Sequence, residues 1–207
     1  MFSRLGKKMH VAPQVDVTIV DGFGDEDEIL DLGGGDEGII GRLRGRQVVA
    51  IDLRPDELKD APDGPRKVVA DARKLPFYDG TFESVTAFFF FMYVKTEEHE
   101  SVLREAFRVL VPGGKLMIWD VDIPAHPPES KTLFAVPVHV TLPGSVVNTA
   151  YGVRWCFHEQ SRRQLRSIAE KNGFVVESET EAGKGFFLAF GKPKPKRTDE
   201  MKERPTI

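Results

Sequence analysis

Short apolar segments alternate with amphipathic segments along most of this chain. Five strands are predicted by stretches that are apolar almost throughout, at residues 28–33, 46–52, 67–71, 84–94 and 115–122. Three helices are predicted between them, at residues 36–45, 54–61 and 96–110. Strands that are apolar throughout, rather than alternating with polar residues, indicate burial on both faces, as in a parallel sheet covered by helices. The pattern therefore predicts an α/β fold, a doubly wound sheet with right-handed crossovers.

The pattern changes after the fifth predicted strand. Two β-rich runs within residues 131–155 flank a Leu-Pro-Gly-Ser sequence, which predicts a hairpin within an insertion at about 123–158. This insertion could form a lid or a contact in a homodimer. A helix over 161–174 and two final strands within 175–192, predicted to pair antiparallel, complete a single domain over residues 1–192. Residues 193–207 have no apolar periodicity, and we expect them to form a disordered tail.

The composition is that of a globular protein and argues against several function classes. Of the 207 residues, 41% are apolar and 29% are charged, and the formal net charge of -3 gives no electrostatic reason to expect nucleic acid as a partner. The sequence has one cysteine, Cys156, so no intrachain disulfide can form. The first residues lack the apolar stretch of a secretory signal, and the longest apolar run, at 85–94, is about half of the ~20 residues that a membrane helix needs. We therefore expect a cytoplasmic chain without a membrane partner.

The stretch from Glu28 to Gly38 carries the clearest chemical signal. Its sequence, EILDLGGGDEG, leads from a predicted strand through a glycine-rich turn into a predicted helix, and Gly33, Gly35 and Gly38 have the G-x-G-x-x-G spacing of dinucleotide-binding loops. Glycines allow the backbone to approach a ligand closely, and the free N–H groups at a helix start can bind a phosphate. A glycine-rich turn can also have a purely steric cause, but its position between a strand and a helix favours a cofactor loop.

Two aspartates end the next two predicted strands. A carboxylate at Asp52 could accept both hydroxyl hydrogens of a ribose, and one at Asp71 could accept a hydrogen bond from an adenine amino group. The structural alternatives are a strand-end cap for Asp52 and a turn-forming residue for Asp71. Together with the glycine loop, the two carboxylates favour a cofactor that contains a nucleoside.

With these residues in place, the sequence resembles the class I S-adenosylmethionine-dependent methyltransferases. The resemblance covers about residues 28–192 and depends on four segments in the family's order and spacing, ILDLGGGDEG, VVAIDLRPDEL, VVADARKLPFYDGTFESVTAFFFFMYV and LREAFRVLVPGGKLMIWD. It implies a Rossmann-like, seven-stranded, mostly parallel sheet whose last strand is antiparallel, and S-adenosyl-L-methionine as cofactor. The family pattern also implies cofactor-binding roles, for Asp31, Gly33, Gly34 and Gly35 at the methionine half, Asp52 at the ribose, Leu53, Asp71 and Ala72 at the adenine, and Phe88 near the methionine moiety. One departure is Glu37, which stands where the usual short loop has glycine.

The sequence does not identify the methyl acceptor. Ligands of open α/β sheets bind at the carboxyl ends of the strands. We therefore expect the acceptor to contact residues that follow the fourth and fifth predicted strands, namely Met92, Tyr93, Trp119, Asp122 and His126. The structural alternatives are a core position for Trp119, solvated loop acids at Asp120 and Asp122, and a loop residue at His126. Related methyltransferases often carry two histidines where this chain has Met92 and Tyr93, so no catalytic residue is assigned. Scattered histidines and one cysteine predict no metal site.

The leading hypothesis is a methyltransferase that acts on a small molecule. Methyl transfer is a displacement at carbon in which the protein mainly aligns the reactants and excludes water, so the absence of a catalytic triad does not argue against an enzyme. An NAD-dependent oxidoreductase would explain the glycine spacing and Asp52, but it leaves Asp71 without a role. A non-catalytic module that only binds the cofactor is a third hypothesis, since a fold alone does not establish function. The atom that is methylated and the oligomeric state stay open.

Overall fold

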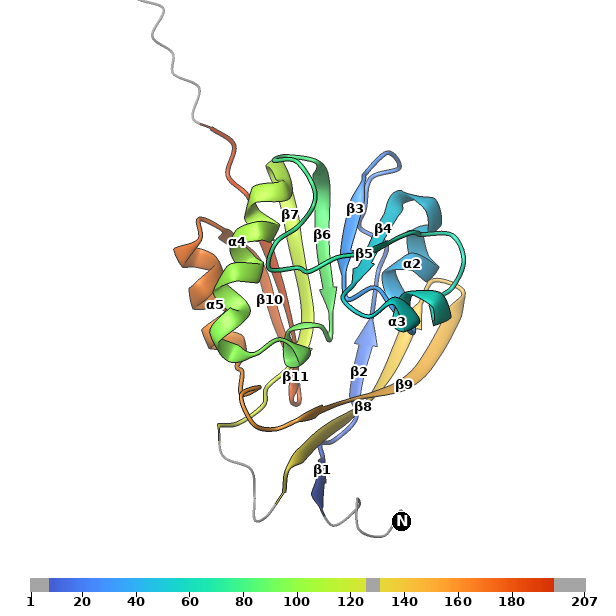
Figure 1. Ribbon diagram of the computed structural model, residues 1–207, viewed down its shortest axis with the longest axis vertical. Coiled ribbons are helices and arrows are strands. Elements are labelled where there is room, and N and C mark those ends of the chain that lie inside the picture. The colour runs from blue at the N-terminus through green and yellow to red at the C-terminus, as the bar shows by residue number, and fades with distance from the viewer. Residues whose placement is uncertain (1–7, 126–130, 196–207) are drawn as a thin grey trace, which may run out of the picture.

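The computed structural model describes residues 8–125 and 131–195. In this part of the chain, seven strands form a central mixed sheet in the order β10-β11-β7-β6-β3-β4-β5 (Figure 1). Its mutually parallel strands are β3 (Ile29–Leu32), β4 (Val48–Asp52), β5 (Arg66–Val69), β6 (Phe82–Phe88) and β7 (Leu110–Val121). At one edge, β11 (Gly185–Gly191) runs antiparallel to β7, and β10 (Val175–Ala182) runs antiparallel to β11. The predicted fold class and the antiparallel last strand are confirmed.

Helices cover both faces of this sheet. They are α2 (Ile39–Arg44), α3 (Pro55–Asp60), α4 (His99–Val109) and α5 (Arg162–Lys171). Short 3-10 turns join the elements, at η1 (Gly45–Gln47), η2 (Phe91–Tyr93) and η3 (Thr96–Glu98). One face carries α2 and α3, and the other carries α4 and α5 packed side by side (Figure 1). Val102, Leu103 and Ala106, which give α4 its helical period, are fully buried against the sheet. Among the described residues no helix has the length and apolar character needed to cross a membrane.

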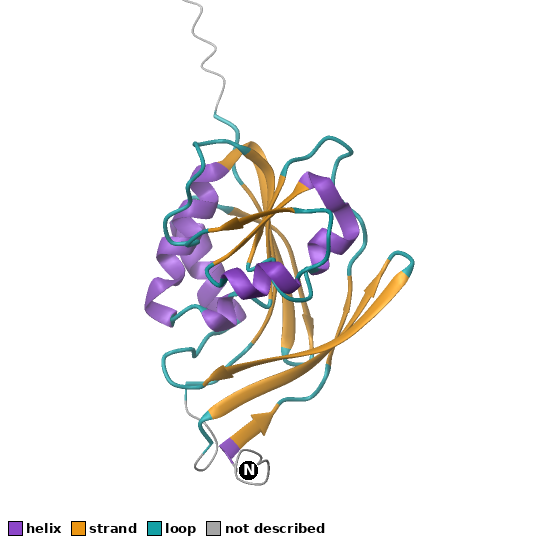
Figure 2. Cartoon of the chain, turned by 45° about the vertical axis from the view of Figure 1, so that its right-hand side comes forward, coloured by secondary structure: helices purple, strands orange, loops and turns teal. Residues whose placement is uncertain are grey.

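A second, smaller sheet lies beside the α/β body (Figure 2). Its strands are β1 (Met9–Val11), β2 (Val15–Thr18), β8 (Leu133–Leu142) and β9 (Ser145–Arg154). β8 and β9 form the predicted hairpin around Pro143 and Gly144, and β1 and β2 pair with β8 in parallel. The two N-terminal strands were not predicted, although Val15, Val17 and Ile19 alternate with polar residues in the way that half-buried strands do.

Two prolines explain why the N-terminal segment forms two short strands instead of one long strand. β1 pairs with residues 133–135 of β8 and β2 pairs with residues 138–141, so the ladder is interrupted at Pro137 and the residue before it. Pro137 has no N–H to donate, and Pro13 occupies the interrupted part of the N-terminal segment. The break therefore falls where neither segment can supply a full set of ladder hydrogen bonds.

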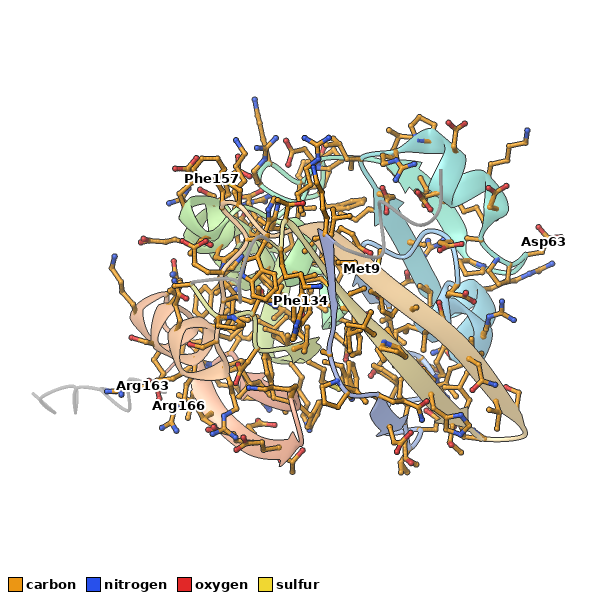
Figure 3. The ribbon with its side chains drawn as sticks, turned by 90° about the horizontal axis from the view of Figure 1, so that it is seen from below. Met9, Asp63, Phe134, Phe157, Arg163 and Arg166 are labelled. Atoms are coloured by element: carbon orange, nitrogen blue, oxygen red, sulfur yellow. The ribbon has the colours of Figure 1, made fainter. Side chains whose placement is uncertain are left out.

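The second sheet packs on the face of the central sheet that also carries α2 and α3. Along β8, buried residues alternate with half-buried ones, and Phe134 belongs to the same apolar cluster as Trp119 of β7. Seen from below, Phe134 lies near the middle of the molecule, whereas Asp63 and Arg163 lie at opposite margins (Figure 3). The inserted hairpin is thus anchored in the core and is not a separate flap.

Replacing Gly185 with alanine is expected to weaken the contact between the two sheets. A Cβ built on Gly185 would overlap Cγ1 of Val15 in β2, so one of the two strands would have to move. Overpacking of this kind typically lowers the free energy of unfolding by about 1–3 kcal/mol. Gly152→Ala in β9 is the matched control, because a Cβ there would meet its nearest neighbours at 3.5 Å and 3.7 Å, which are ordinary contact distances. Urea denaturation measures the loss of unfolding free energy in both variants. Equal losses would show that Val15 can move aside at little cost.

The fourth strand is shorter than predicted. The apolar run predicted a strand over residues 84–94, but β6 ends at Phe88 and η2 follows. Phe89 takes a left-handed backbone conformation with φ of 48°, and its N–H donates to the carbonyl of Trp119 at 2.7 Å. The apolar run continues past the strand because Phe91 and Met92 in the turn are also fully buried. Apolar character alone therefore did not mark the end of the strand.

The first helix is also shorter than predicted. The sequence predicted a helix over residues 36–45, with two acids in its first turn, but α2 begins at Ile39. Gly38 precedes it in a left-handed conformation with φ of 52°, and Asp36 has φ of 49°. Asp36 and Glu37 therefore belong to the turn after β3. The predicted end is correct, since the left-handed Gly45 follows the last helical residue.

Candidate functional site

A cavity of about 430 Å³ lies at the carboxyl ends of β3, β4, β5 and β6. All nine residues that the family pattern assigns to cofactor binding line it, namely Asp31, Gly33, Gly34, Gly35, Asp52, Leu53, Asp71, Ala72 and Phe88. The topology explains why they converge, because neighbouring parallel strands have their carboxyl ends at the same edge of the sheet. The structure thus brings together residues from four separate segments of the sequence.

The turn after β3 has no room for a side chain at any of its three consecutive glycines, and a Cβ on Gly35 would lie 2.6 Å from Cβ of Glu57. Gly33 has φ of 70°, and a Cβ on it would lie 2.6 Å from Cδ2 of Phe90. A Cβ on Gly34 would lie 2.7 Å from Oδ2 of Asp31. Close packing around the turn is therefore one reason why its residues are glycines. The same absence of side chains leaves the backbone of the turn accessible to a ligand in the cavity.

Asp31 is the most deeply buried carboxylate in the cavity wall. It is 2% exposed, and Oγ1 of Thr86 in β6 donates a hydrogen bond to its Oδ1 at 2.7 Å. Burial raises the pKa of Asp31 to about 7, and the hydrogen bond from Thr86 opposes this shift. A cation bound beside Asp31 would favour the ionised carboxylate and would lower this pKa.

Asp31→Asn is expected to remove a pH dependence of stability. The pKa of Asp31 is about 7 in the folded protein against 3.8 for an ordinary aspartate, so between these values the folded chain holds a proton that the unfolded chain has released. The free energy of unfolding of the wild type should therefore fall relative to Asp31→Asn as the pH rises from 4 to 7, by up to about 1.4 kcal/mol per pH unit, and should level off above pH 7. Urea denaturation between pH 4 and pH 8 measures the difference. Parallel profiles for the two proteins would contradict a raised pKa at Asp31.

The carboxylate of Asp52 is oriented by the turn that follows β4. The N–H of Arg54 donates to its Oδ1 at 2.8 Å, and Oδ2 lies toward the glycine turn, 3.1 Å from the place of a Cβ on Gly35. The next residue, Leu53, is 62% exposed and lines the same cavity. A carboxylate beside an exposed apolar side chain suits a ligand that presents hydroxyl groups next to a flat ring.

Asp71 is held by Arg73, two residues later. Nε of Arg73 lies 2.9 Å from Oδ1 and 3.0 Å from Oδ2 of this carboxylate, and Nη2 lies 2.7 Å from Oδ2. Arg73 also pairs with Glu98 of η3, and all three side chains line the cavity. The hydrogen bonds from Arg73 lower the pKa of Asp71 and so keep the carboxylate ionised. Arg73 is a component of the cavity that the sequence did not single out.

One wall of the cavity is aromatic and consists of Phe88, Phe89, Phe90, Tyr93 and Tyr151. Tyr151 comes from β9 of the hairpin and stacks on Phe89, with ring centroids 5.0 Å apart and 15° between the planes. The hydroxyl of Tyr93 accepts a hydrogen bond from the N–H of Gly152 at 3.1 Å, which joins η2 to β9. Burial raises the pKa of both tyrosines, so both phenols stay neutral near pH 7. The hairpin is thus part of the cavity wall.

Of the four predicted acceptor contacts that the structure describes, one lines this cavity. Tyr93 does so, whereas Met92 is fully buried and Trp119 lines a second cavity. Asp122 accepts a hydrogen bond from the N–H of Arg162 at the start of α5, at 2.7 Å. His126 lies outside the described residues.

The interpretation of Asp120 as a solvated loop acid is wrong. Asp120 is 1% exposed, and four groups donate hydrogen bonds to its carboxylate. Its Oδ2 accepts from the N–H groups of Phe91 at 2.8 Å and Met92 at 3.3 Å. Its Oδ1 accepts from the N–H of Val121 at 2.9 Å and from Nε2 of Gln160 at 2.6 Å. Burial raises the pKa of Asp120 to about 7, and these donors oppose the shift. Asp120 therefore fixes η2, and with it part of the aromatic wall, to the end of β7.

Comparison with known proteins identifies this arrangement. Residues 30–118, from β3 into β7, match the model of a family described as a methyltransferase domain. Two curated relatives are both named ubiquinone/menaquinone biosynthesis C-methyltransferase UbiE. The relative from Cronobacter sakazakii is 33% identical over 127 residues, which cover 55% of this chain and 50% of the relative. The relative from Citrobacter koseri is 36% identical over 135 residues, which cover 58% and 53%. These matches support a class I S-adenosylmethionine-dependent methyltransferase.

Solved structures extend the methyltransferase fold over most of the chain. A protein from Pyrococcus horikoshii has a TM-score of 0.61 at 22% sequence identity, with 81% of this chain and 82% of that chain covered. A methyltransferase from Methanosarcina mazei has a TM-score of 0.60 at 20% identity, with 84% and 95% covered. By contrast, the chain spans about half the length of the curated relatives it matches.

S-adenosylmethionine is the cofactor of this methyltransferase family, and the charges of the cavity fit it. Six acidic residues line the cavity, Asp31, Asp36, Asp52, Glu57, Asp71 and Glu98. Its two arginines are paired with acids, Arg54 with Glu57, and Arg73 with Asp71 and Glu98. The excess of carboxylates suits a ligand that carries both a sulfonium and an ammonium charge. In the described ranges, no group of three or more His, Cys, Asp or Glu side chains could hold a metal ion.

Proposed function

We propose that this chain transfers a methyl group from S-adenosylmethionine to a small-molecule acceptor. The observation that supports this most strongly is that nine residues chosen from the sequence line one cavity. An NAD-dependent oxidoreductase would account for the glycine loop and Asp52, but a methyltransferase also accounts for the acids at Asp31 and Asp71. The match to the methyltransferase domain and the similarity to the UbiE relatives support the same choice.

Individual residues suit particular parts of the cofactor. Asp31 would pair with the ammonium group of the methionine part, and Asp52 would accept hydrogen bonds from the ribose hydroxyls. Leu53 would lie against the adenine ring, and Asp71 would accept from its amino group. Because Arg73 already donates to both oxygens of Asp71, the adenine would share this carboxylate with Arg73 and would not replace it.

The acceptor is proposed to lie against the aromatic wall, between Tyr93 and Tyr151. Bound S-adenosylmethionine supplies an activated methyl group. Both phenols stay neutral near pH 7 because their pKa values are raised, and no histidine lines the cavity within the described chain. We therefore expect the acceptor atom to be nucleophilic without deprotonation by a histidine. The contribution of the chain is to align the acceptor and to exclude water.

The cellular setting is proposed from composition. A single cysteine and a net charge of -3 support a cytoplasmic chain without a nucleic-acid partner. We treat residues 1–192 as one domain, and a homodimer through the hairpin stays a prediction. Met92, Trp119, Asp122 and His126 also stay predictions as acceptor contacts.

Calorimetric titration tests the proposed function most directly. S-adenosylmethionine and S-adenosylhomocysteine are each expected to bind saturably to the wild type, with submillimolar affinity, and NAD is the control that should not bind. A screen for transfer of radiolabelled methyl from S-adenosylmethionine to small-molecule acceptors would follow. Failure of both sulfur compounds to bind, or preferential binding of NAD, would exclude the proposal.

A further inference from the structure

A second cavity, of about 560 Å³, is not used by the cofactor site. Its floor lies on β7 and β11, over the part of the central sheet that neither α2 nor α3 covers. Met117 pairs with Ala189 and Trp119 pairs with Phe187, so their side chains project from the same face of the sheet. The rings of Trp119 and Phe187 pack with centroids 4.9 Å apart. The floor of this second cavity is therefore apolar and partly aromatic.

The wall of the second cavity comes from the N-terminal segment. Val15, Val17 and Ile19 line it from β2 and the residue that follows β2. Four charged residues also line it: Glu177 and Lys115 pair with each other at 3.6 Å, the buried carboxylate of Asp120 accepts hydrogen bonds from backbone N–H groups and Gln160, and Asp16 accepts one from Gln14. From Lys115 to Trp119 the floor runs four residues along β7, about 13 Å at the rise of a strand. These dimensions and this lining suit an extended, uncharged, apolar ligand.

Phe89 lies between the second cavity and the cofactor site. It lines both cavities, and it is fully buried, with its ring stacked on Tyr151 of the aromatic wall. Its left-handed backbone conformation, unusual for a bulky residue, aims the side chain at this boundary. An elongated molecule held in the second cavity would thus end next to the place proposed for the acceptor.

We infer that the second cavity holds the apolar part of the methyl acceptor, while the part to be methylated lies at the aromatic wall. This inference rests on the proposed methyltransferase function. Its physical basis is the apolar floor, the apolar side chains of Val15, Val17 and Ile19 in the wall, and the boundary shared at Phe89. The acceptor is therefore an amphiphile with a compact reactive end and an extended aliphatic portion.

Quenching of tryptophan fluorescence by 10-bromodecan-1-ol tests this site, because bromine quenches tryptophan on contact. The chain has two tryptophans, and the Trp155→Phe variant leaves Trp119 in the cavity floor as the reporter. Saturable quenching of Trp119 is expected, and it should persist when S-adenosylmethionine is present at saturation. If Trp155→Phe does not fold, the wild type and Trp119→Phe are compared, and quenching should be lost in the latter.

A pair of matched substitutions locates the probe. Ala189→Phe would fill the second cavity from its floor and should weaken binding of the bromoalcohol by about tenfold or more. Ala150→Phe makes the same change on the exposed face of β9, outside both cavities, and should leave the affinity unchanged. If Ala189→Phe does not fold, Val17→Asp in the wall takes its place and is expected to weaken binding of the bromoalcohol. Val146→Asp in β9 is its control and should leave the affinity unchanged.

Three results would overturn the inference. The first is quenching that rises without saturation, and the second is equal affinity in Ala189→Phe and Ala150→Phe. The third is displacement of the bromoalcohol by S-adenosylmethionine, which would mean that the probe occupies the first cavity. Failure of the proposed function is distinguishable, because calorimetry would then find no S-adenosylmethionine binding whatever the bromoalcohol does.

Discussion

Replacing Asp52 with alanine is expected to weaken the binding of S-adenosylmethionine by about 100-fold or more. Hydrogen bonds to a charged group contribute about 1.5–3 kcal/mol each, and the ribose would lose two of them. The fold should tolerate the change, because the hydrogen bond that the Asp52 side chain accepts from the backbone comes from Arg54, within its own turn. Calorimetric titration of the variant with S-adenosylmethionine measures the loss.

Two further variants make the Asp52 result specific. Asp63→Ala removes an exposed carboxylate at the margin of the molecule (Figure 3) and should leave the affinity unchanged. Asp52→Asn keeps an oxygen that can accept from the N–H of Arg54 but removes the charge, so an intermediate affinity is expected. Wild-type affinity in Asp52→Ala would mean that the cofactor does not use this carboxylate.

Asp120→Asn is expected to lower the free energy of unfolding by about 3–5 kcal/mol when it is measured at pH 5. The carboxylate accepts four hydrogen bonds in a buried site, from three backbone N–H groups and from Gln160. Asparagine would turn an NH2 group toward these donors and would leave some of them unpaired. Since burial raises the pKa of Asp120 to about 7, the wild type loses stability relative to Asp120→Asn as the pH rises through this range, so the difference should be smaller at pH 8 than at pH 5.

Asp122→Asn is the matched control for this measurement. It makes the same chemical change two residues along the chain, where the side chain is half-buried and accepts one hydrogen bond, from the N–H of Arg162. A loss of about 1 kcal/mol or less is expected there. Equal losses in Asp120→Asn and Asp122→Asn would show that the buried hydrogen bonds do not account for the role of Asp120.

The sequence correctly predicted those parts of the fold that depend on residues close together in the chain. Each parallel strand contains a short apolar run, and Asp31, Asp52 and Asp71 lie in or just after such runs. Because parallel strands present their carboxyl ends at one edge, these acids converge on the cavity without further information. Their individual roles in binding stay predictions.

The parts that could not be predicted depend on contacts between distant segments. The end of β6 at Phe88 is set by the carbonyl of Trp119 and the carboxylate of Asp120, which come from β7. Nothing within the run of four phenylalanines marks it. The partner of β1 and β2 is likewise β8, far along the chain. The apolar alternation in β2 could have indicated a strand, but not the strand with which it pairs.

The pairing of β1 and β2 with β8 has a consequence for the order of assembly. Met9 lies beside Leu133, so the first strands of the chain have no partner until the five parallel strands of the central sheet have been synthesised. Closing so long a loop is slow compared with forming the local β8–β9 hairpin. We therefore expect the parallel sheet and the glycine turn to fold early and the N-terminal strands to dock last. The cavity bounded by β2 would be the final part of the molecule to take shape.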